Sequence, residues 1–231
     1  MRLLDFDTPS LTSLLPEDAA AALRRAATMM VYGDGALIYS RGDAHPGLSL
    51  VRTGAVQIGN PGIDGSFVVT SVLGPGQCFG EMTLFGQLPR THDSVAVGQT
   101  VIDQLSPAAY AAVSAVHPAI NQAILGMMAR RIHALLEFSD DLRRLPLIVQ
   151  LAKTLLRMAP GAARGGEVLA KQEAIAATLG VSRVAIGTAL ATLEGQGLIQ
   201  RGYGRVTIRD RNALQQWLAQ RTMLAPIDGL A

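Results

Sequence analysis

The sequence contains very little of what disulfide, metal or covalent chemistry requires. Cys78 is the only cysteine among 231 residues, which excludes an internal disulfide framework, a cysteine-based zinc site and an all-cysteine iron–sulfur cluster. No nucleophile–base pair, metal-ligand spacing or glycine-rich nucleotide loop is present, so we expect no enzyme and assign no metal site. A secretory segment and an apolar run of membrane-spanning length are also missing. We therefore expect a cytoplasmic protein without a membrane partner.

Lysine is absent from the first part of the chain, and the charge is distributed unevenly. Residues 1–145 hold ten Arg and no Lys against thirteen acidic residues, a net charge of −3. Residues 146–231 hold eight Arg and two Lys against five acidic residues, a net charge of +5. A basic C-terminal third suits a polyanion such as DNA, because neutralised phosphates supply most non-specific affinity. A solvated cationic surface would have the same composition.

The stretch 172–193, QEAIAATLGVSRVAIGTALATL, has the pattern of two short helices with a tight turn. Gly180 stands where a residue that tolerates positive φ is favoured, and Ser182 is a good cap for the second helix. The predicted buried stripe of that helix is Ile186, Ala189, Leu190 and Leu193. This spacing is typical of a helix-turn-helix, whose second helix enters the DNA major groove. An ordinary αα-hairpin uses the same residue types.

The first half of the chain predicts a helix followed by many short strands. Residues 1–30 are helical in pattern, with a start at Pro16-Glu17-Asp18. Alternating runs separated by Gly, Pro, Asp and Asn predict strands at 36–39, 48–52, 55–58, 67–73 and 100–105. Such spacing favours an antiparallel sandwich or small barrel, for example a jelly roll. We interpret Arg41-Gly42-Asp43 as a turn.

A long helix is predicted from Pro118 to about Leu142. Apolar residues recur there at three- and four-residue steps: Ile124, Met128, Leu135, Phe138, Leu142 and Leu145. This seam favours a two-stranded coiled coil between two copies of the chain, although Arg131 falls on it. The alternative is a core helix packed on its own barrel.

The chain after the long helix is predicted to bend and then form a compact unit. A hinge is expected at Arg143-Arg144-Leu145-Pro146, because proline breaks the preceding helix. A helix over 146–158, a polar loop over 160–167 and the helix-turn-helix follow. Residues 198–200 and 205–208 then flank Arg201-Gly202-Tyr203-Gly204, which predicts a β-hairpin wing. We interpret Trp217, in the last helix, as a packing residue.

The stretch from Phe79 to Thr91 carries the residues for a ligand site. Gly80 allows a turn, and a short helix from Glu81 would direct its positive end at an anion. Arg90 offers a fork that matches phosphate, and Thr91 adds a hydroxyl donor. A carboxylate at Glu81 suits a sugar hydroxyl, so the set fits a phosphate attached to a ribose. An internal Glu81–Arg90 ion pair that stabilises a loop is the alternative.

Phe79-Gly80-Glu81, eight residues and then Arg90-Thr91 resemble the phosphate-binding cassette of cyclic-nucleotide-binding domains. The order of elements over residues 14–215 resembles the catabolite activator and fumarate–nitrate regulator superfamily of bacterial transcription factors. Further matching segments are Met128-Ala129-Arg130-Arg131, Thr154-Leu155-Leu156 and LGVSR at 179–183.

The resemblance implies an α+β fold with three parts. These are a jelly-roll sensor domain at 1–116, a dimerisation helix and hinge at 117–145, and a winged helix-turn-helix at 146–231. It also implies a homodimer formed through residues 118–145. The implied partners are double-stranded DNA at a pseudo-palindromic site and RNA polymerase.

The resemblance implies a ligand site formed by Gly80, Glu81, Met82, Arg90, Thr91, Leu135 and Leu136. Glu81 would meet a ribose hydroxyl, and Arg90 with Thr91 would hold the cyclic phosphate of cyclic AMP or cyclic GMP. His92 and Asp93 depart from the cassette, which usually continues with alanine. Leu135 and Leu136 replace hydroxyl residues that meet adenine in cyclic-AMP sensors, so the usual base contacts are not expected. Haem, held by Cys78, His45, His92 or His133, is an alternative effector group.

The residues expected to contact DNA are Gln172, Ser182, Arg183, Val184, Gly187, Thr188 and Arg205. Arg183 can bind a guanine bidentately, which is worth about 1–3 kcal/mol of discrimination. Val184 and Thr188 stand where the superfamily commonly has Glu and Arg, so we predict a target sequence different from that of the catabolite activator. Gln172 and Arg205 are candidates for phosphate contacts.

Two further functions are consistent with the sequence. The chain could regulate transcription without an effector, with Glu81 and Arg90 kept as a structural pair. It could also be a cyclic-nucleotide-binding module that docks on a partner enzyme, although the basic C-terminal third argues against this.

Overall fold

The computed structural model describes residues 9–62, 65, 67–159, 166–168 and 172–222. The chain divides into two compact units between His133 and Ala134, inside one long helix. The helices of the first unit are a 3₁₀ turn at Leu11–Leu14, α1 (Glu17–Ala26), α2 (Glu81–Gly86), α3 (Pro107–Val116) and the start of α4 (Ala119–Arg144). Its strands are β1 (Thr28–Tyr32), β2 (Leu37–Tyr39), β3 (Leu48–Pro61), β4 (Phe67–Leu73), β5 (Cys78–Phe79) and β6 (Asp93–Leu105).

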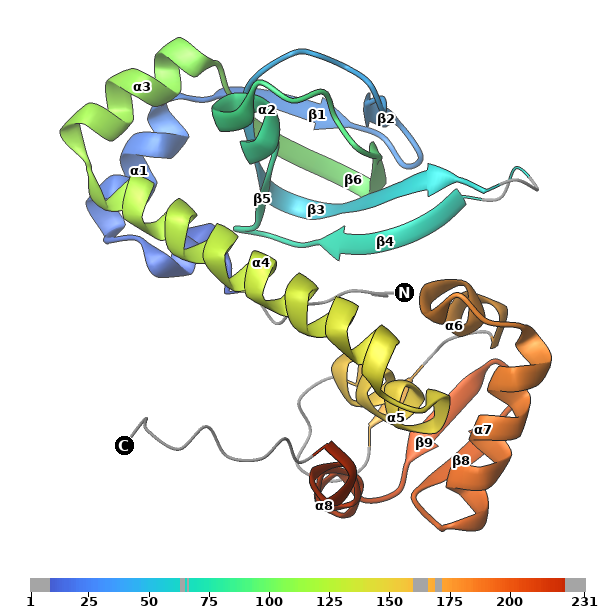
Figure 1. Cartoon of the computed structure of the whole chain (residues 1–231). Helices are drawn as coiled ribbons and strands as arrows, with labels where there is room; N and C mark the ends of the chain where they lie inside the picture. Colours follow the sequence, from blue (N-terminus) through green and yellow to red (C-terminus); the bar gives the residue numbers. More distant parts are fainter. Residues whose placement is uncertain (1–8, 63–64, 66, 160–165, 169–171, 223–231) are drawn as a thin grey trace, which may run out of the picture. The chain divides into compact units, whose positions relative to one another are not determined.

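The strands of the first unit form one antiparallel sheet in the order β1-β6-β3-β4 (Figure 1). β2 also pairs with β6, and β5 pairs with β3. The antiparallel character predicted for this region is therefore confirmed. The two strands predicted at 48–52 and 55–58 are one strand, β3, whose register shifts on both sides of Thr53. The helical pattern of residues 1–30 is broken by β1, because Thr28 pairs with Gln104 of β6; residues 1–8 lie outside the described part.

Two apolar clusters hold the first unit together. One joins the 3₁₀ turn, α1, β3 and α4 through fully buried side chains, among them Leu11, Leu23, Leu48, Ile120 and Ile124. The other fills the inside of the sheet and comprises Val51, Val56, Leu73, Phe79 and Ile102. Full burial of a side chain of this size stabilises the fold by about 1.5–3 kcal/mol. The start of α4 is therefore a core element of this unit.

The apolar seam predicted on the long helix is wrong in part. Ile124 is buried in the core of the first unit, while Phe138 and Leu145 pack against the core of the second. Ile124 is therefore fully covered by its own chain, whereas Phe138 and Leu145, like Met128 in the first unit, are only partly covered. The apolar side chains of α4 that stay exposed are Leu125, Ile132, Leu135, Leu136 and Leu142.

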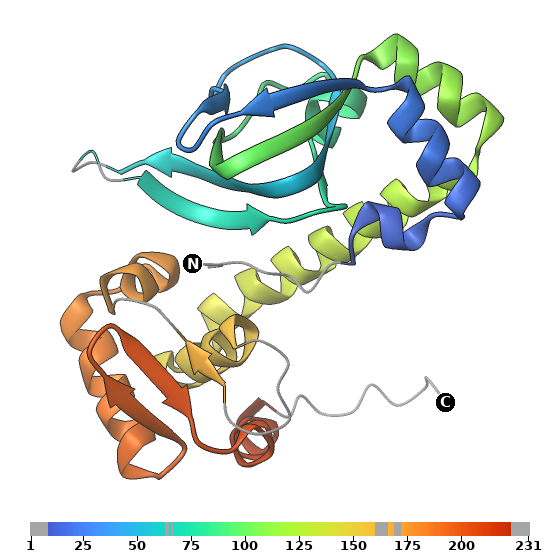
Figure 2. The ribbon, with the colours of Figure 1, turned by 180° about the vertical axis from the view of Figure 1, so that it is seen from behind.

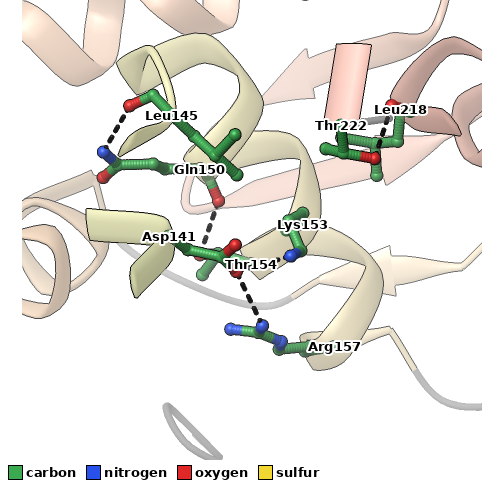
Figure 3. A network of polar contacts seen from close by, with 8 residues as sticks. All are labelled: Asp141, Leu145, Gln150, Lys153, Thr154, Arg157, Leu218 and Thr222. Atoms are coloured by element: carbon green, nitrogen blue, oxygen red, sulfur yellow. Dashed lines mark hydrogen bonds and ion pairs between the residues drawn. The ribbon is translucent and has the colours of Figure 1, made fainter. Parts of the chain in front are cut away.

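A set of polar contacts ties the end of α4 to α5 (Leu147–Met158) (Figure 3). Asp141 forms an ion pair with Lys153 at 2.5 Å and another with Arg157 at 3.2 Å. The Gln150 amide donates to the carbonyl oxygens of Leu145 at 2.8 Å and Leu142 at 3.2 Å. The break between the helices lies at the predicted proline, since α4 ends at Arg144 and Pro146 precedes α5. Side chains of α5 thus bind residues at the end of α4 across the break.

The remaining elements of the second unit are β7 (Glu167–Val168), α6 (Gln172–Leu179), α7 (Arg183–Gly195), β8 (Ile199–Gly202), β9 (Arg205–Ile208) and α8 (Arg211–Thr222). The three strands pair antiparallel in the order β7-β9-β8 (Figure 2). The helix-turn-helix and the wing thus appear as predicted. β7 was not predicted and forms where a polar loop was expected, because it pairs with β9; positions 160–165 of that loop lie outside the described residues.

Local chemistry explains the turn between α6 and α7. Gly180 has a φ of +66°, and the Ser182 hydroxyl accepts a hydrogen bond from the Ala185 backbone N–H at 3.2 Å. Ile186 and Leu190 of α7 are fully buried against α5 and α6. Among the described helices none is by itself long and apolar enough to cross a membrane; α6 and α7 pass that test only jointly, with a bend of 105° between them.

Candidate functional site

Arg90 lies buried in the first unit, and no carboxylate of the described residues forms an ion pair with it. Its side chain lies over the Tyr39 ring, with the guanidinium carbon 3.4 Å from the ring centroid. Its backbone is fixed by the turn at 41–43, because its N–H donates to the Asp43 carbonyl at 3.0 Å and its carbonyl accepts from the Gly42 N–H at 2.8 Å. The residue is 8% exposed. Burial lowers the pKa of Arg90, while Tyr39, Asp43 and Glu81 act in the opposite direction.

Two donors of Arg90 are left unused. Its Nε and Nη2 atoms are buried, and neither has a hydrogen-bond partner within the described part of the chain. An arginine stays charged at any ordinary pH, even with a lowered pKa. Burying an unpaired charge costs several kcal/mol, so buried charges in proteins are normally paired. The guanidinium therefore has two unsatisfied donor atoms, a deficit that the oxygens of an anion would remove.

Gly80 lies directly beside this guanidinium. It precedes α2 with a φ of +95°, and an added Cβ would be 3.3 Å from Arg90 Nη1 and only 2.4 Å from the Gly47 carbonyl oxygen. Only glycine fits both the backbone conformation and the space. The Gly80 carbonyl accepts from the Thr83 hydroxyl at 2.7 Å, which fixes the first turn of α2. The sequence-predicted cassette thus brings Gly80 and Arg90 together.

The predicted alternative, a Glu81–Arg90 ion pair, is wrong. Glu81 is buried and its Oε1 binds the Arg131 guanidinium from α4. Arg131 Nη2 also donates to the Cys78 carbonyl oxygen at 3.3 Å. Glu81 Oε2 is buried and has no hydrogen-bond partner among the residues described. A carboxylate with one free acceptor therefore lies in the same cassette as an arginine with two free donors.

Sequence reasoning missed Tyr39 and Arg131 in this site. Arg131 left a sequence signal, because a charged residue on an apolar seam requires a buried partner. Tyr39 left none, since nothing in a short alternating strand distinguishes a tyrosine beneath an arginine from any other strand residue.

The other predicted ligand residues, Met82, Thr91, Leu135 and Leu136, are exposed side chains. Met82 is 45% exposed on α2, and Thr91 is exposed with its hydroxyl 2.8 Å from His92 Nδ1. Burial lowers the pKa of His92, with Arg41 acting in the same direction. Leu135 and Leu136 are exposed on the part of α4 that belongs to the second unit.

Cys78 is a buried structural residue. Its side chain is fully buried in β5 with its sulfur 3.9 Å from the Met127 sulfur. Burial raises the pKa of the thiol well above its ordinary value, and the Glu81 charge raises it further. A thiolate ligand or redox thiol needs the opposite environment. Within the described residues, no three His, Cys, Asp or Glu side chains come together as a metal site.

The predicted DNA-reading residues lie at the start of α7. Arg183 and Val184 are highly exposed, with 69% of the Arg183 side chain and 77% of Val184 accessible. Thr188 is exposed one turn later, and its hydroxyl donates to the Val184 carbonyl at 3.1 Å. The Ser182 hydroxyl is used within the helix cap.

Gln172 of α6 lies against Gly187 of α7. A Cβ built at Gly187 would be 3.7 Å from Gln172 Oε1, an ordinary contact distance. The start of α6 therefore approaches the middle of α7 closely, as the two helices of a helix-turn-helix do.

The wing adds an exposed basic surface. Arg205 is exposed and pairs with Glu167 of β7 at 3.2 Å. Arg201 is held by Glu194 of α7, whose two oxygens accept from its backbone N–H at 2.8 Å and its Nε at 2.6 Å. Tyr203, at the tip of the wing, is fully exposed. Arg201 and Arg205 line a hollow together with Arg209.

Comparison with known proteins places both units. Residues 29–115 match the family of cyclic nucleotide-binding domains, and residues 149–217 match the Crp-like helix-turn-helix domain. The chain is 28% identical over 202 residues to the CRP-like cAMP-activated global transcriptional regulator of Mycobacterium tuberculosis, covering 85% of this chain and 90% of that protein. It is 27% identical over 215 residues to the cyclic AMP receptor protein of Thermus thermophilus, covering 90% and 96%.

The fold has a counterpart among solved structures. A CooA variant from Carboxydothermus hydrogenoformans superimposes with a TM-score of 0.70 at 19% identity, covering 94% of this chain and 98% of that one. The relatives named above are transcription regulators of the CRP family, not enzymes. With a cyclic nucleotide-binding domain followed by a Crp-like helix-turn-helix, the chain belongs to the catabolite activator and fumarate–nitrate regulator superfamily of transcription regulators.

Proposed function

We propose that the chain is a homodimeric, sequence-specific DNA-binding regulator whose first unit binds a cyclic nucleotide. The main evidence for an effector site is Arg90, a buried guanidinium with two donor atoms that have no partner among the described residues. A cyclic phosphate supplies the anionic oxygens that these donors lack, and charge-assisted bonds of this kind are the strong ones. Glu81 Oε2, the free acceptor in the same cassette, suits a ribose hydroxyl. The names of the two relatives, cAMP-activated regulator and cyclic AMP receptor, support this ligand class.

Calorimetry tests the effector. We expect heat of binding when the purified chain is titrated with cyclic AMP or cyclic GMP, and no heat for the Arg90→Ala variant. Arg24→Ala is the control, because Arg24 is an exposed arginine of the same unit, on α1. Leu135 and Leu136 cannot donate a hydrogen bond to a base, so we expect little discrimination between the two nucleotides. Binding that survives Arg90→Ala would overturn the assignment.

We propose that the dimer forms through the exposed side of α4. Leu125, Met128, Ile132, Leu135 and Leu142 follow alternating steps of three and four residues, apart from one polar position at Ser139. Four of these apolar side chains are exposed and Met128 is half-buried. Such a repeat is what a two-stranded coiled coil requires.

Effector control requires that the ligand prefer one of two arrangements of the dimer. DNA binding should then change when the nucleotide is added. A gel-shift with the DNA upstream of the chain's own reading frame, with and without each nucleotide, measures this. A shift that is identical in all arms would support the effector-independent regulator, and no complex with any genomic fragment would contradict DNA binding. Such a regulator would act in the cytoplasm, with RNA polymerase as the expected further partner.

A further inference from the structure

Glu173 of α6 forms an ion pair with Arg183 of α7. The nearest atoms are Glu173 Oε1 and Arg183 Nε, 3.2 Å apart. The carboxylate lies in the first turn of α6, and Arg183 is the first residue of α7. The pair therefore crosses the turn of the helix-turn-helix at the end where Arg183 and Val184 are exposed.

Stability of the fold does not explain this pair. The two side chains are 69% and 58% exposed, and pairs that are this exposed contribute little to the free energy of unfolding. Arg183 also stands in an unfavourable place for a cation, because the first turn of a helix carries the positive end of its dipole. The first turn of α7 has no acidic residue of its own. Glu173 is the acidic residue that compensates Arg183 from outside the helix.

The ion pair leaves the Nη1 and Nη2 atoms of Arg183 available for a base. Since Nε is the nearest atom, the carboxylate approaches the guanidinium from the side of its stem. No hydrogen bond occupies Nη1 or Nη2 among the residues that the structure describes. A guanine presents O6 and N7 together, and a bidentate contact needs two such parallel donors. Glu173 thus lies beside the guanidinium as an ion-pair partner while two donors remain available.

The charge of Glu173 acts on the competing DNA as well. A free arginine binds any phosphate, and this sequence-independent attraction is the main part of non-specific affinity. A carboxylate beside Arg183 weakens that attraction to the charged phosphate, whereas a guanine carries no net charge and is recognised by the direction of two parallel hydrogen bonds. The pair therefore favours the base over the backbone.

We propose that Glu173 is a positioning residue that sets base specificity, by holding Arg183 for guanine and reducing its affinity for phosphate. The inference rests on the proposed sequence-specific DNA binding, with Arg183 as the base-reading residue. It makes two measurable statements. Replacing Glu173 weakens the guanine preference at the base pair that Arg183 contacts, and it strengthens binding to unrelated DNA.

Selection from a random double-stranded DNA library tests the inference without a known target. The full-length protein is used, with cyclic AMP, cyclic GMP or no nucleotide in parallel arms. We expect the natural chain to enrich a motif, and Arg183→Ala to lose the preference for one guanine per half-site by about 5- to 150-fold. Glu173→Ala and Glu173→Gln should weaken that same preference by about 3- to 10-fold and leave the other positions unchanged.

Binding to a fixed non-specific duplex at several salt concentrations gives the second readout. Glu173→Gln should bind it more tightly, with a salt slope steeper by about 1. Glu167→Gln is the control, because it also removes one negative charge and releases an arginine, Arg205 of the wing. This variant should strengthen binding to all sequences equally and leave the motif unchanged.

The outcomes separate the inference from the function on which it rests. If the natural chain enriches no motif in any arm, the proposed function fails and the inference with it. If a motif appears but Arg183→Ala leaves it unchanged, or if Glu173→Ala keeps the guanine preference or weakens every position equally, only the inference is overturned. Thermal unfolding of each variant shows whether a uniform loss comes from an unstable fold.

Discussion

Replacing Arg90 by methionine should make the first unit more stable in the absence of ligand. The natural side chain is 8% exposed and has two buried donors without partners. A binding site that holds an unmatched charge is less stable when empty than an apolar core of the same shape. Methionine has a similar length and adapts to irregular gaps. It would retain the packing on Tyr39 and remove the charge.

The magnitude follows from two opposing contributions. Each buried, unsatisfied donor costs about 1–3 kcal/mol, and relief of two donors stabilises the fold. Loss of the cation–π contact with Tyr39, at 3.4 Å, costs about 1–2 kcal/mol. We expect a net gain of about 1–3 kcal/mol in the free energy of unfolding. For a unit of this size the gain corresponds to about 3–10 °C in the midpoint of thermal unfolding.

Differential scanning calorimetry of the full chain measures the effect. The two units can unfold separately, and the fluorescence of Trp217, the only tryptophan, identifies the transition of the second unit. Arg52→Met is the contrasting variant, because Arg52 holds the buried Asp103 carboxylate through two bonds of 3.0 and 2.6 Å. It should lower stability by about 2–4 kcal/mol. Arg90→Met should in addition abolish any midpoint shift by cyclic nucleotides. A loss of more than about 1 kcal/mol in Arg90→Met without ligand would refute the reasoning, since the guanidinium would then be a structural partner.

Three further variants test other parts of the structure. Gly80→Ala should destabilise the first unit by about 2 kcal/mol or more in urea unfolding, because residue 80 has a positive φ and its Cβ would lie 2.4 Å from the Gly47 carbonyl oxygen. A loss under about 0.5 kcal/mol would contradict this. Ile132→Glu should give a monomer with unchanged circular dichroism in sedimentation equilibrium, and an unchanged dimer would exclude the α4 seam. Burial lowers the pKa of His92 in the folded chain, so the unfolded chain binds a proton there more readily. The contribution of the neutral His92 side chain to the free energy of unfolding is therefore present above about pH 6.5 and lost below it. His92→Gln should flatten the pH dependence of unfolding between about pH 5 and 7, and an unchanged slope would count against it.

Local features of the fold could be predicted because their causes lie within a few residues of chain. The Ser182 cap, the positive φ of Gly180 and the helix break at Pro146 each depend on short-range hydrogen bonds or on backbone sterics. The wing strands followed from a turn between two alternating runs. β7 could not be predicted, since two residues become a strand only when β9 lies beside them.

The candidate sites divide in the same way. Residue types and spacing identified Gly80 with Arg90, and Arg183 with Val184, because each pair serves one local structure. Spacing alone assigned Glu81 the wrong partner, since Arg90 is nine positions away in sequence and the true partner, Arg131, is 50. The exposed side of α4 was also misjudged, because periodicity shows that a face is apolar but not whether its own chain covers it.

The sequence by itself determined the order of elements, the family resemblance, the basic C-terminal unit and the residues of the phosphate cassette. The tertiary structure alone decided that Arg90 lies unpaired on Tyr39, that Glu81 binds Arg131, and that Glu173 lies beside Arg183. The physical reason is the range of the forces involved. Capping, turns and helix periodicity act between neighbours in the chain, whereas the energy of a charge depends on burial and on distances in space that the fold brings about.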